Sequence, residues 1–134
     1  RVNFLEETFA LLKLQNITAI HGRAEEFAKN KSYRETYDLC VSRAVSNLAT
    51  LSEYCLPYVK VGGKFISYKS GTVQEEAEQA EKAIRILGGK IQDVVYFNLP
   101  DSEIQRSLVV IEKIKPTPGK YPRKAGTPLK EPLS

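Results

Sequence analysis

The order of its β-prone and helical segments constrains this chain more than any other feature of the sequence. Helical spacing of apolar residues is seen over 4–14, 47–58 and 72–87, and β-prone runs are seen over 17–20, 37–41, 64–68, 91–99 and 107–114. Strands that alternate with helices favour a parallel sheet. The last two runs leave no room for a helix between them, so they should pair antiparallel. The sequence therefore predicts an α/β fold whose parallel sheet ends in an antiparallel strand pair.

Local signals place some of the element boundaries. Thr72 followed by Glu75 matches the capping box that begins many helices, and Gly88-Gly89 should end the same helix. Gly62-Gly63 is expected to form a turn between elements. Residues 24–29 are expected to form a single helical turn that starts with acidic side chains.

Composition excludes several classes of protein. A chain of 134 residues with 42% hydrophobic residues suits one domain with a core rather than two. No apolar run approaches the roughly 18 residues that a membrane span needs, so we expect no membrane partner. Cys40, Cys55 and His21 lack metal-ligand spacing, so we expect no metal site. The cysteines are expected to be buried thiols of a cytoplasmic protein, since the cytosol keeps thiols reduced.

Basic charge gathers at the carboxy-terminal end. After position 112 there are six Lys or Arg residues and one Glu, so this end is strongly positive while the rest of a chain of net charge +4 is nearly neutral. Clustered Lys and Arg gain binding free energy by releasing counterions from phosphates, which favours a polyanionic partner. A solvated, disordered tail is the alternative that charge alone leaves open.

The chain lacks the Gly-rich turn with which many α/β sheets hold a cofactor. Its glycines are spaced as turns and helix ends, and Gly22 precedes a helix without the G-x-G-x-x-G context. The chain also opens on a helix rather than on a strand. We therefore expect that the first two strands of the fold and the cofactor loop are absent from this chain.

Four stretches of the sequence resemble one known family. They are Arg1-Val2-Asn3-Phe4-Leu5, Gly22-Arg23-Ala24-Glu25, Ser42-Arg43-Ala44-Val45 and Lys120-Tyr121-Pro122-Arg123-Lys124-Ala125-Gly126-Thr127-Pro128. The last has no general structural reason to recur, and the four together resemble the RsmG family, also called glucose-inhibited division protein B. The resemblance covers the whole chain and implies a class I methyltransferase fold, which is Rossmann-like. Family members carry a further stretch before this point, so the chain is expected to be a fragment.

The resemblance implies that the intact protein transfers a methyl group from S-adenosylmethionine to N7 of a guanine in 16S ribosomal RNA of the small ribosomal subunit. Residues 1–114 would then be part of the S-adenosylmethionine-dependent domain, and 115–134 a basic, Pro-rich tail. The chain alone is expected to be inactive. Guanine N7 carries a lone pair and no proton at neutral pH, so alignment is the main task and no general base is needed. A chain with one His, and with cysteines in mid-strand and mid-helix, fits this chemistry.

The resemblance also implies which residues contact the methyl donor: Ala24 and Glu25 against the adenine, and Arg43. Ligands of open α/β sheets bind beyond the carboxyl ends of the strands, and all three residues follow predicted strands. A backbone N–H at Ala24 or Glu25 can donate to a ring nitrogen of adenine, and the Glu25 carboxylate can accept from its exocyclic amine. The Arg43 guanidinium suits a carboxylate or a phosphate. Two alternatives stay open: Glu25 only charges a helix start, or Arg43 pairs with Asp38.

RNA contacts are expected from basic residues and one aromatic ring. Lys120, Arg123 and Lys124 can meet phosphates, and Tyr121 can stack on an unpaired base. The prolines around them should keep the tail extended. Lys69 follows a predicted strand and is a further candidate, although it is equally an ordinary surface lysine.

Two other classes of function stay open. A non-catalytic RNA-binding or ribosome-interaction module would need no donor loop, and the missing loop would favour it if the gene product itself starts at Arg1. A nicotinamide-binding Rossmann domain is the other class. The antiparallel terminal strands and the basic, Pro-rich tail count against it.

Overall fold

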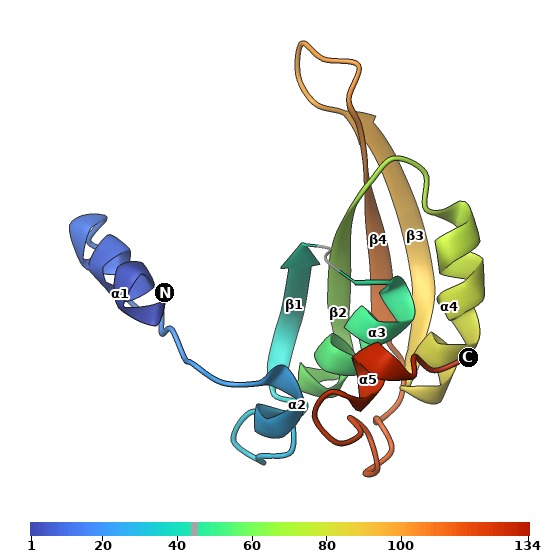
Figure 1. Ribbon diagram of the computed structural model, residues 1–134, viewed down its shortest axis with the longest axis horizontal. Helices are drawn as coiled ribbons and strands as arrows, with labels where there is room; N and C mark the ends of the chain where they lie inside the picture. Colours follow the sequence, from blue (N-terminus) through green and yellow to red (C-terminus); the bar gives the residue numbers. More distant parts are fainter. Residues whose placement is uncertain (44–45) are drawn as a thin grey trace.

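A four-stranded mixed sheet forms the centre of the computed structural model, which describes residues 1–43 and 46–134 (Figure 1). In spatial order the strands are β1 (Tyr37–Arg43), β2 (Val59–Ser70), β4 (Gln105–Lys113) and β3 (Gly89–Asn98). β1 and β2 run parallel, and β4 pairs antiparallel with both β2 and β3. The predicted α/β class and the antiparallel terminal pair are therefore confirmed.

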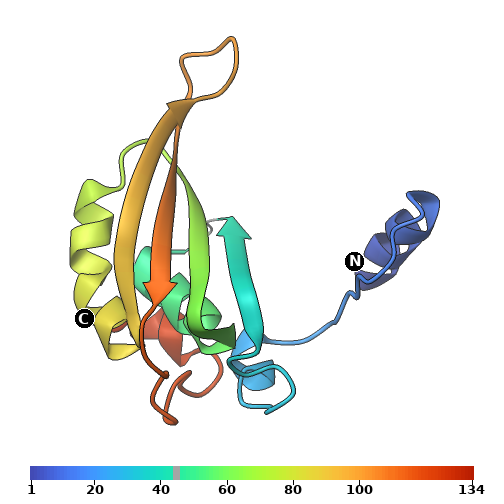
Figure 2. The ribbon, with the colours of Figure 1, turned by 180° about the vertical axis from the view of Figure 1, so that it is seen from behind.

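Helices cover one face of this sheet. After β1 the chain forms α3 (Leu48–Cys55), the 3-10 turn η1 (Leu56–Tyr58), α4 (Gln74–Ile86) and α5 (Thr127–Lys130). α3 and α4 lie side by side against the face that is turned toward the viewer in Figure 1. From behind, the strands are seen with no described helix packed across them (Figure 2). The core therefore lies on one side of the sheet.

Strand alternation decides which side chains enter that core. Phe65, Ser67 and Lys69 of β2 and Val109 and Ile111 of β4 are buried, while their neighbours in each strand are more exposed. The buried residues of α4 recur every three or four positions: Ala77, Ala80, Ala83 and Ile84. Since each Å² of buried apolar surface contributes roughly 25 cal/mol, this single apolar layer is the main source of stability.

The close approach of α4 to the sheet requires glycine at position 89. A Cβ there would lie 2.9 Å from Cγ2 of Ile111 and 3.0 Å from Cγ2 of Ile84 and Cδ1 of Leu56. α4 ends at Ile86, as Gly88-Gly89 predicts. The same glycine pair therefore ends the helix and lets β3 begin under it.

The observed helix starts agree only in part with those predicted from the sequence. Asn47 caps α3, because its side-chain oxygen accepts the N–H of Thr50 at 2.9 Å. The capping box predicted at Thr72 is wrong: the N-cap of α4 is Val73, and no side chain accepts a hydrogen bond there. α4 is held at its start by packing instead, since Val73 is almost fully buried.

The turn predicted at Gly62-Gly63 is also wrong, because both glycines lie inside β2. They stand where the pairing of β2 with β1 shifts register, between the partners of Tyr37 and Leu39. A Cβ at Gly63 would lie 2.6 Å from the backbone oxygen of Asp38. Glycine thus permits the two strands to meet closely at an irregular point, rather than reversing the chain.

The amino-terminal segment, residues 1–23, stands apart from the sheet (Figures 1 and 2). α1 (Val2–Leu11) is the predicted first helix, but none of its residues is buried, and Phe4 and Leu11 are well exposed. The strand predicted over 17–20 is wrong, because those residues form no strand. A strand needs a neighbour to pair its N–H and C=O groups, and no described strand lies beside this segment.

The carboxy-terminal segment, residues 115–134, folds back on the domain. Tyr121, Pro122 and Pro128 are buried, and α5 lies within the segment. The segment passes the end of the sheet where β1 and β2 begin (Figure 1). Its prolines shape a packed loop, which differs from the extended arm that they were expected to form.

Candidate functional site

The carboxyl ends of parallel strands are where open α/β sheets bind their ligands. Arg43 is the last residue of β1, pairs with Tyr68 of β2 and is exposed. Asp38, its predicted alternative partner, forms an ion pair with Lys60 instead. Residues 44–45, which complete the Ser-Arg-Ala-Val stretch, lie outside the described residues. The Arg43 guanidinium therefore stands at the ligand-binding edge of the sheet.

A cleft of about 620 Å³ opens beside Arg43. Its lining includes Arg43, Tyr68, Ser70, Phe97, Arg106 and Leu108. Arg43 and Tyr68 are partners in one cross-strand row, and Arg106 lies opposite Ser70 and Phe97 in the neighbouring row. Two guanidinium groups and two aromatic rings thus share one cleft. Sequence reasoning missed Arg106, because its partners lie on two other strands.

Lys69 is also among the residues that line this cleft, but its ammonium group is buried in an ion pair. Its Nζ lies 2.6 Å from Oε2 of Glu76 and donates to the backbone oxygen of Ser46 at 2.8 Å. The same Glu76 oxygen accepts the N–H of Leu48 at 2.7 Å. Lys69 therefore joins the starts of α3 and α4. Its predicted contact with RNA stays a prediction, and the structure offers no free ammonium group there.

α2 (Ala24–Phe27) lies at the opposite end of the sheet, beside the beginnings of β1 and β2 (Figure 1). The hydroxyl of Tyr58, directly before β2, donates to the backbone oxygen of Ala24 at 2.5 Å. The structure therefore does not bring Ala24 and Glu25 next to Arg43, although all three were expected at one edge. Ala24 is exposed, and in the described residues no backbone hydrogen bond uses its N–H as donor.

The Glu25 carboxylate is turned into the protein, and the residue is only 4% exposed. Its Oε2 accepts the N–H of Gly126 at 2.9 Å and lies 3.5 Å from Nη2 of Arg23. Burial alone raises the pKa of Glu25, but the N–H groups of Gly126 and of Glu25 itself, with Arg23, outweigh burial and hold the pKa below its usual value of 4.5. Glu25 is thus ionised at neutral pH and bound to the carboxy-terminal segment.

Arg123 is the main anchor of the carboxy-terminal segment. Its Nη2 lies 2.8 Å from Oε1 of Glu53, a fully buried residue of α3, and its backbone N–H donates to the other oxygen of that carboxylate at 2.8 Å. The hydrogen bonds to Glu53 raise the pKa of Arg123. Arg123 was expected to meet RNA phosphates, and in the structure it holds an internal carboxylate instead.

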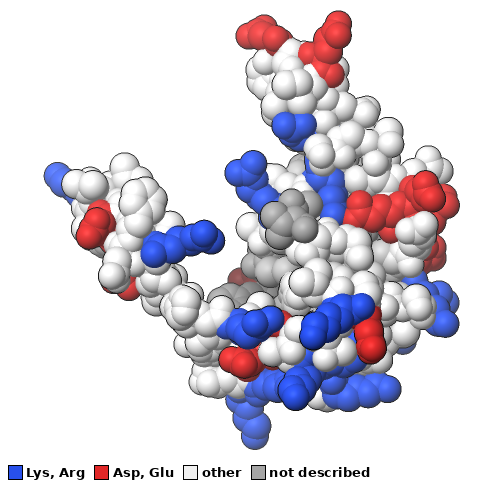
Figure 3. Space-filling view, viewed as in Figure 1, with Lys and Arg blue, Asp and Glu red and all other residues white. Residues whose placement is uncertain are grey.

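The other residues that were predicted to contact RNA differ in their exposure to solvent. Tyr121 is 8% exposed, whereas Lys120 and Lys124 are exposed. Nζ of Lys120 lies 5.3 Å from the centre of the Tyr121 ring, which is a cation–π contact. Lys and Arg side chains gather on this end of the molecule (Figure 3). Of the four tail residues predicted to bind RNA, Lys120 and Lys124 have exposed cationic side chains.

Sequence reasoning did not identify the residues that bind the beginning of the carboxy-terminal segment. Nη1 of Arg34 donates to the backbone oxygen of Tyr121 at 2.8 Å, and its Nη2 donates to that of Thr117 at 3.0 Å. Nζ of the fully buried Lys113 lies 3.1 Å from Oε2 of Glu35. Arg34 and Tyr121 are 87 residues apart in the chain, so no local pattern could reveal such a pairing.

Among the described residues, the cysteines and the possible metal ligands form no second site. A hydrogen bond shared with Cys40, together with burial, raises the pKa of Cys55 well above its usual value, so this thiol is protonated at neutral pH. Within residues 1–43 and 46–134, no three His, Cys, Asp or Glu side chains gather as a metal site requires. No helix of the described chain is long and apolar enough to cross a membrane.

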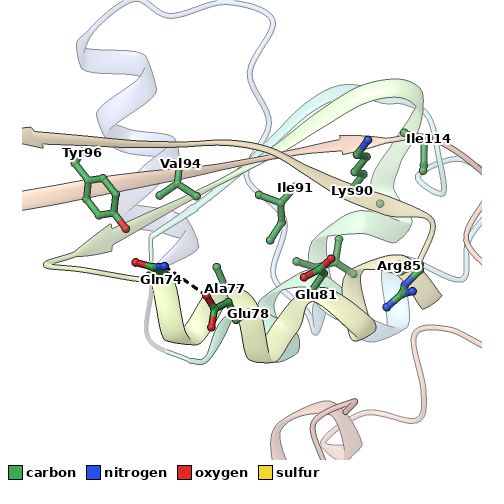
Figure 4. Close-up of a pocket in the computed structure, with 12 residues that line it drawn as sticks. Gln74, Ala77, Glu78, Glu81, Arg85, Lys90, Ile91, Val94, Tyr96 and Ile114 are labelled. Atoms are coloured by element: carbon green, nitrogen blue, oxygen red, sulfur yellow. Dashed lines mark hydrogen bonds between the residues drawn. The ribbon is translucent and has the colours of Figure 1, made fainter.

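A second cavity, of about 610 Å³, lies between α4 and the edge strand β3 (Figure 4). Its floor includes Ala77, Ile91 and Val94. At its rim the Gln74 amide donates to Oε1 of Glu78 at 3.5 Å. None of the site residues predicted from the sequence lines this cavity. We therefore place the candidate site at the carboxyl ends of the strands, beside Arg43.

Solved structures with a similar fold include S-adenosylmethionine-dependent methyltransferases. TYW2 of M. jannaschii in complex with AdoMet has a TM-score of 0.60 and 14% identity, over 84% of this chain and 53% of that one. A SAM-dependent O-methyltransferase of Thermotoga maritima has a TM-score of 0.50 and 11% identity, over 87% of this chain and 48% of that one. At such identities the likeness shows the fold alone, which is that of class I methyltransferases.

Curated relatives match along nearly the whole sequence. Ribosomal RNA small subunit methyltransferase G of Lachnoclostridium phytofermentans is 56% identical over 133 residues, which are 99% of this chain and 55% of the relative. The protein of the same name from Clostridium tetani is 51% identical over 133 residues, which are 99% of this chain and 56% of the relative. The chain thus spans about half the length of the curated relatives it matches.

The family match agrees with the fold and with these relatives. Residues 1–109 match the model of the family described as GidB, rRNA small subunit methyltransferase G. The resemblance that four stretches of the sequence indicated is therefore confirmed. The chain belongs to the GidB family of rRNA small subunit methyltransferase G.

Proposed function

We propose that the full-length protein that contains this chain transfers a methyl group from S-adenosylmethionine to N7 of a guanine in 16S ribosomal RNA. The observation that carries the proposal is the 56% and 51% identity to two proteins named ribosomal RNA small subunit methyltransferase G. On this proposal its partner is the RNA of the small ribosomal subunit, and it works in the cytoplasm, where bacterial ribosomes are assembled.

The residues of this chain fit the methyl donor in part. The bound donor supplies a methyl group on a positively charged sulfur. Arg43, exposed at the carboxyl edge of the sheet, suits the donor's carboxylate. The Glu25 carboxylate is bound to Gly126, and α2 lies at the opposite end of the sheet (Figure 1), so of the three predicted donor residues Arg43 alone lies at the candidate site.

The cleft beside Arg43 suits the acceptor guanine. Guanidinium groups hold phosphates, and aromatic rings stack on unpaired bases, so Arg106, Tyr68 and Phe97 provide both kinds of contact. None of the described residues that line the cleft is a carboxylate or a histidine. Guanine N7 has no proton to lose, so alignment of N7 with the methyl group replaces proton transfer. A cleft without a general base is consistent with such a reaction.

The outer side of the carboxy-terminal segment supports a further contact with RNA. Lys120 and Lys124 of the carboxy-terminal segment are exposed. Lys and Arg side chains gather on one end of the molecule (Figure 3). Each free ammonium group can neutralise one phosphate. We therefore assign the tail's part in RNA binding to these two lysines, while Arg123 and Tyr121 hold the segment in place.

Methyl transfer is the direct test of this function. The full-length protein is incubated with methyl-labelled S-adenosylmethionine and small ribosomal subunits from a strain that lacks this modification. We expect the label in 7-methylguanosine after nuclease digestion of the 16S RNA. Label in another nucleoside would overturn the assignment of N7, and no transfer at all would overturn the enzymatic function.

Donor binding separates the methyltransferase from a non-catalytic RNA-binding module. Calorimetric titration with S-adenosylmethionine should show binding to the full-length protein. The 134-residue chain alone should bind at least about tenfold more weakly, because it spans only 55% of its relative and lacks the Gly-rich loop. Equal affinities would contradict this expectation. RNA binding without any donor binding by the full-length protein would favour the non-catalytic module.

A further inference from the structure

A third cavity, of about 430 Å³, lies where α4 ends and the carboxy-terminal segment begins. This is the end of the sheet opposite the carboxyl ends of β1 and β2 (Figure 1). The cavity is lined by Lys82, Arg85, Ile86, Lys115, Pro116 and Pro118. Three of these six side chains are cationic and none is acidic, so we call this cavity the basic cleft.

The three cations have no carboxylate partner in the described chain. Lys82, Arg85 and Lys115 are exposed, and none of them forms an ion pair there. Glu78 and Glu81 of the same helix line the cavity beside β3 instead, which Arg85 also borders (Figure 4). Lys82 and Arg85 are three positions apart on α4, so they lie on one face of the helix and repel each other. An anion bound in the basic cleft would relieve this repulsion.

The end of α4 does not need these cations as a cap. Basic side chains near the end of a helix commonly neutralise its unpaired backbone oxygens. Here the backbone oxygen of Leu87 accepts the Thr117 hydroxyl at 2.7 Å. The backbone oxygen of Gly88 accepts the N–H groups of Ile114 and Lys115 at 2.9 and 3.1 Å. Since protein donors satisfy these oxygens, the ammonium and guanidinium groups are available to a ligand.

One wall of the basic cleft is fixed before any ligand binds. The φ angles of Pro116 and Pro118 are set by their rings, and Thr117 between them is buried. Nη2 of Arg34 donates to the backbone oxygens of Thr117 and Pro118 at 3.0 and 3.1 Å. A wall that is already ordered loses little conformational entropy on binding. The basic cleft is thus a preformed site for an anion.

The lining favours a phosphate of a nucleic-acid backbone over a small free anion. Sites for a free phosphate commonly use converging backbone N–H groups, and the two prolines of this wall have none. Exposed Lys and Arg side chains are the usual contacts to a nucleic-acid backbone, where they gain affinity by releasing counterions.

We propose that the basic cleft binds backbone phosphates of the RNA substrate, as a second contact remote from the acceptor guanine. The proposal rests on the proposed function, because it takes RNA as the substrate. Along β4, Arg106 of the first cleft and Lys113 are seven positions apart, which is roughly 23 Å in a strand. A stacked strand carries a phosphate roughly every 3.4 Å, so the two contacts are about seven nucleotides or more apart. They therefore hold different parts of the RNA.

RNA binding across a salt series tests this second contact. In the full-length protein, Lys82, Arg85 and Lys115 are replaced together with Ala, and binding to 16S RNA that lacks the modification is compared with the parent. Up to three phosphate contacts are lost, so the slope of log affinity against log salt should flatten by about 2 units, and the KM for RNA should rise at least about tenfold. Donor affinity and kcat should stay within about twofold, because Arg43 lies at the other end of the sheet. An unchanged slope would overturn the proposal.

A matched pair of lysines separates the basic cleft from net charge. Lys90 is exposed and forms no ion pair in the described chain, as is true of Lys115, but it lines the cavity beside β3. Lys115→Ala should flatten the salt slope by about 0.7 units, whereas Lys90→Ala should leave it unchanged. Lys115→Arg keeps the charge and should restore the parental slope. Equal effects of the two alanine variants would mean that only net charge matters, and they would overturn the proposal.

Stability and a free anion are tested on the same proteins. All three replaced side chains are exposed, so the triple variant should keep the Tm of the parent; if it does not fold, the single lysine variants decide. Inorganic phosphate is the probe for a free anion. Phosphate binding that the triple variant loses, with equal salt slopes for RNA, would assign the basic cleft to a small anion and overturn the proposal.

The outcomes for the two proposals differ. A parent protein that binds 16S RNA but transfers no methyl group would remove the proposed function, and the salt slopes would still test the basic cleft. Methyl transfer with equal slopes for parent and triple variant would remove only this inference. A parent that binds no RNA would overturn both.

Discussion

Residues 1–23 are the more apolar end of the chain, yet they stand clear of the sheet, whereas the basic and proline-rich residues 115–134 pack against it. The amino-terminal helix exposes Phe4 and Leu11, and the carboxy-terminal segment buries Tyr121 and its neighbouring proline. Hydrophobicity alone would have predicted the reverse. Whether a segment packs against the sheet depends on whether the described chain offers partners for its side chains.

The carboxy-terminal segment finds its partners in charged groups that the domain already buries. Glu53, Glu25 and Arg34 stand at the end of the sheet and bind the segment through its backbone and through Arg123. In the described chain, no such group of charged side chains lies against the amino-terminal helix. Its large exposed apolar side chains are of the kind that mark a contact surface. The comparison therefore predicts that changes at the two ends have very different effects.

The largest effect is expected at Arg123. Arg123→Ala leaves the Glu53 carboxylate buried and without its ion-pair partner, which should lower the free energy of unfolding by about 3 kcal/mol. Lys124→Ala, one position along and exposed, is the matched control and should stay within about 0.5 kcal/mol. Urea unfolding of the two variants measures both. A similar small effect for each would show that the segment is not anchored as described.

A smaller effect, with a defined pH dependence, is expected at Glu25. Its folded-state pKa lies below 4.5, so the unfolded state takes up the proton first as the pH falls. The stability that Glu25 contributes is complete at neutral pH and is lost as the pH falls below 4.5 through the folded-state pKa. Glu25→Gln should therefore be less stable than the parent by about 1 kcal/mol at pH 7. The gap should close in acid, and a gap that widens there would contradict the assignment.

The outer lysines should affect RNA binding and leave stability alone. Replacing Lys120 and Lys124 with Ala in the full-length protein removes up to two phosphate contacts, which should flatten the slope of log affinity against log salt by about 1.5 units. Donor affinity should stay within about twofold, since screening limits the reach of an exposed charge to roughly 8 Å. Arg123 is left intact because it holds Glu53. An unchanged salt slope would remove the segment from the RNA interface.

The smallest effect is expected at the amino-terminal end. Deleting residues 1–16 from the 134-residue chain should change its free energy of unfolding by less than about 0.5 kcal/mol, because α1 has no buried residue. Chemical denaturation of the two chains provides the measurement. A loss of several kcal/mol would mean that α1 packs against the sheet in solution.

The sequence predicted the elements that repeat a local pattern and failed where the partner lies far away in the chain. The apolar periodicity of α4 and the β-prone runs of β3 and β4 carry their own signals, and so does Gly88-Gly89. The strand predicted over 17–20 had a suitable local pattern, but a strand also needs a neighbour.

In the candidate site, too, the sequence revealed residues with a local signal and not those whose partners lie far away in the chain. The family resemblance, together with its position after a strand, singled out Arg43, which does stand at the carboxyl edge. Arg106 reaches the same cleft only because β4 lies between β2 and β3. Glu25 and Arg123 were recognised as special residues, but their internal partners Gly126 and Glu53 are 101 and 70 positions away.

Hydrogen exchange of the 134-residue chain tests the contrast between the two ends most directly. The N–H groups of Arg123 and Gly126 donate to buried carboxylates, so they should exchange as slowly as amides of β4. The amides of α1 should exchange almost as fast as in an unfolded chain, because an isolated ten-residue helix is only marginally stable. Fast exchange at Arg123 and Gly126, at the rate of α1, would contradict the account of a carboxy-terminal segment anchored to α2 and α3.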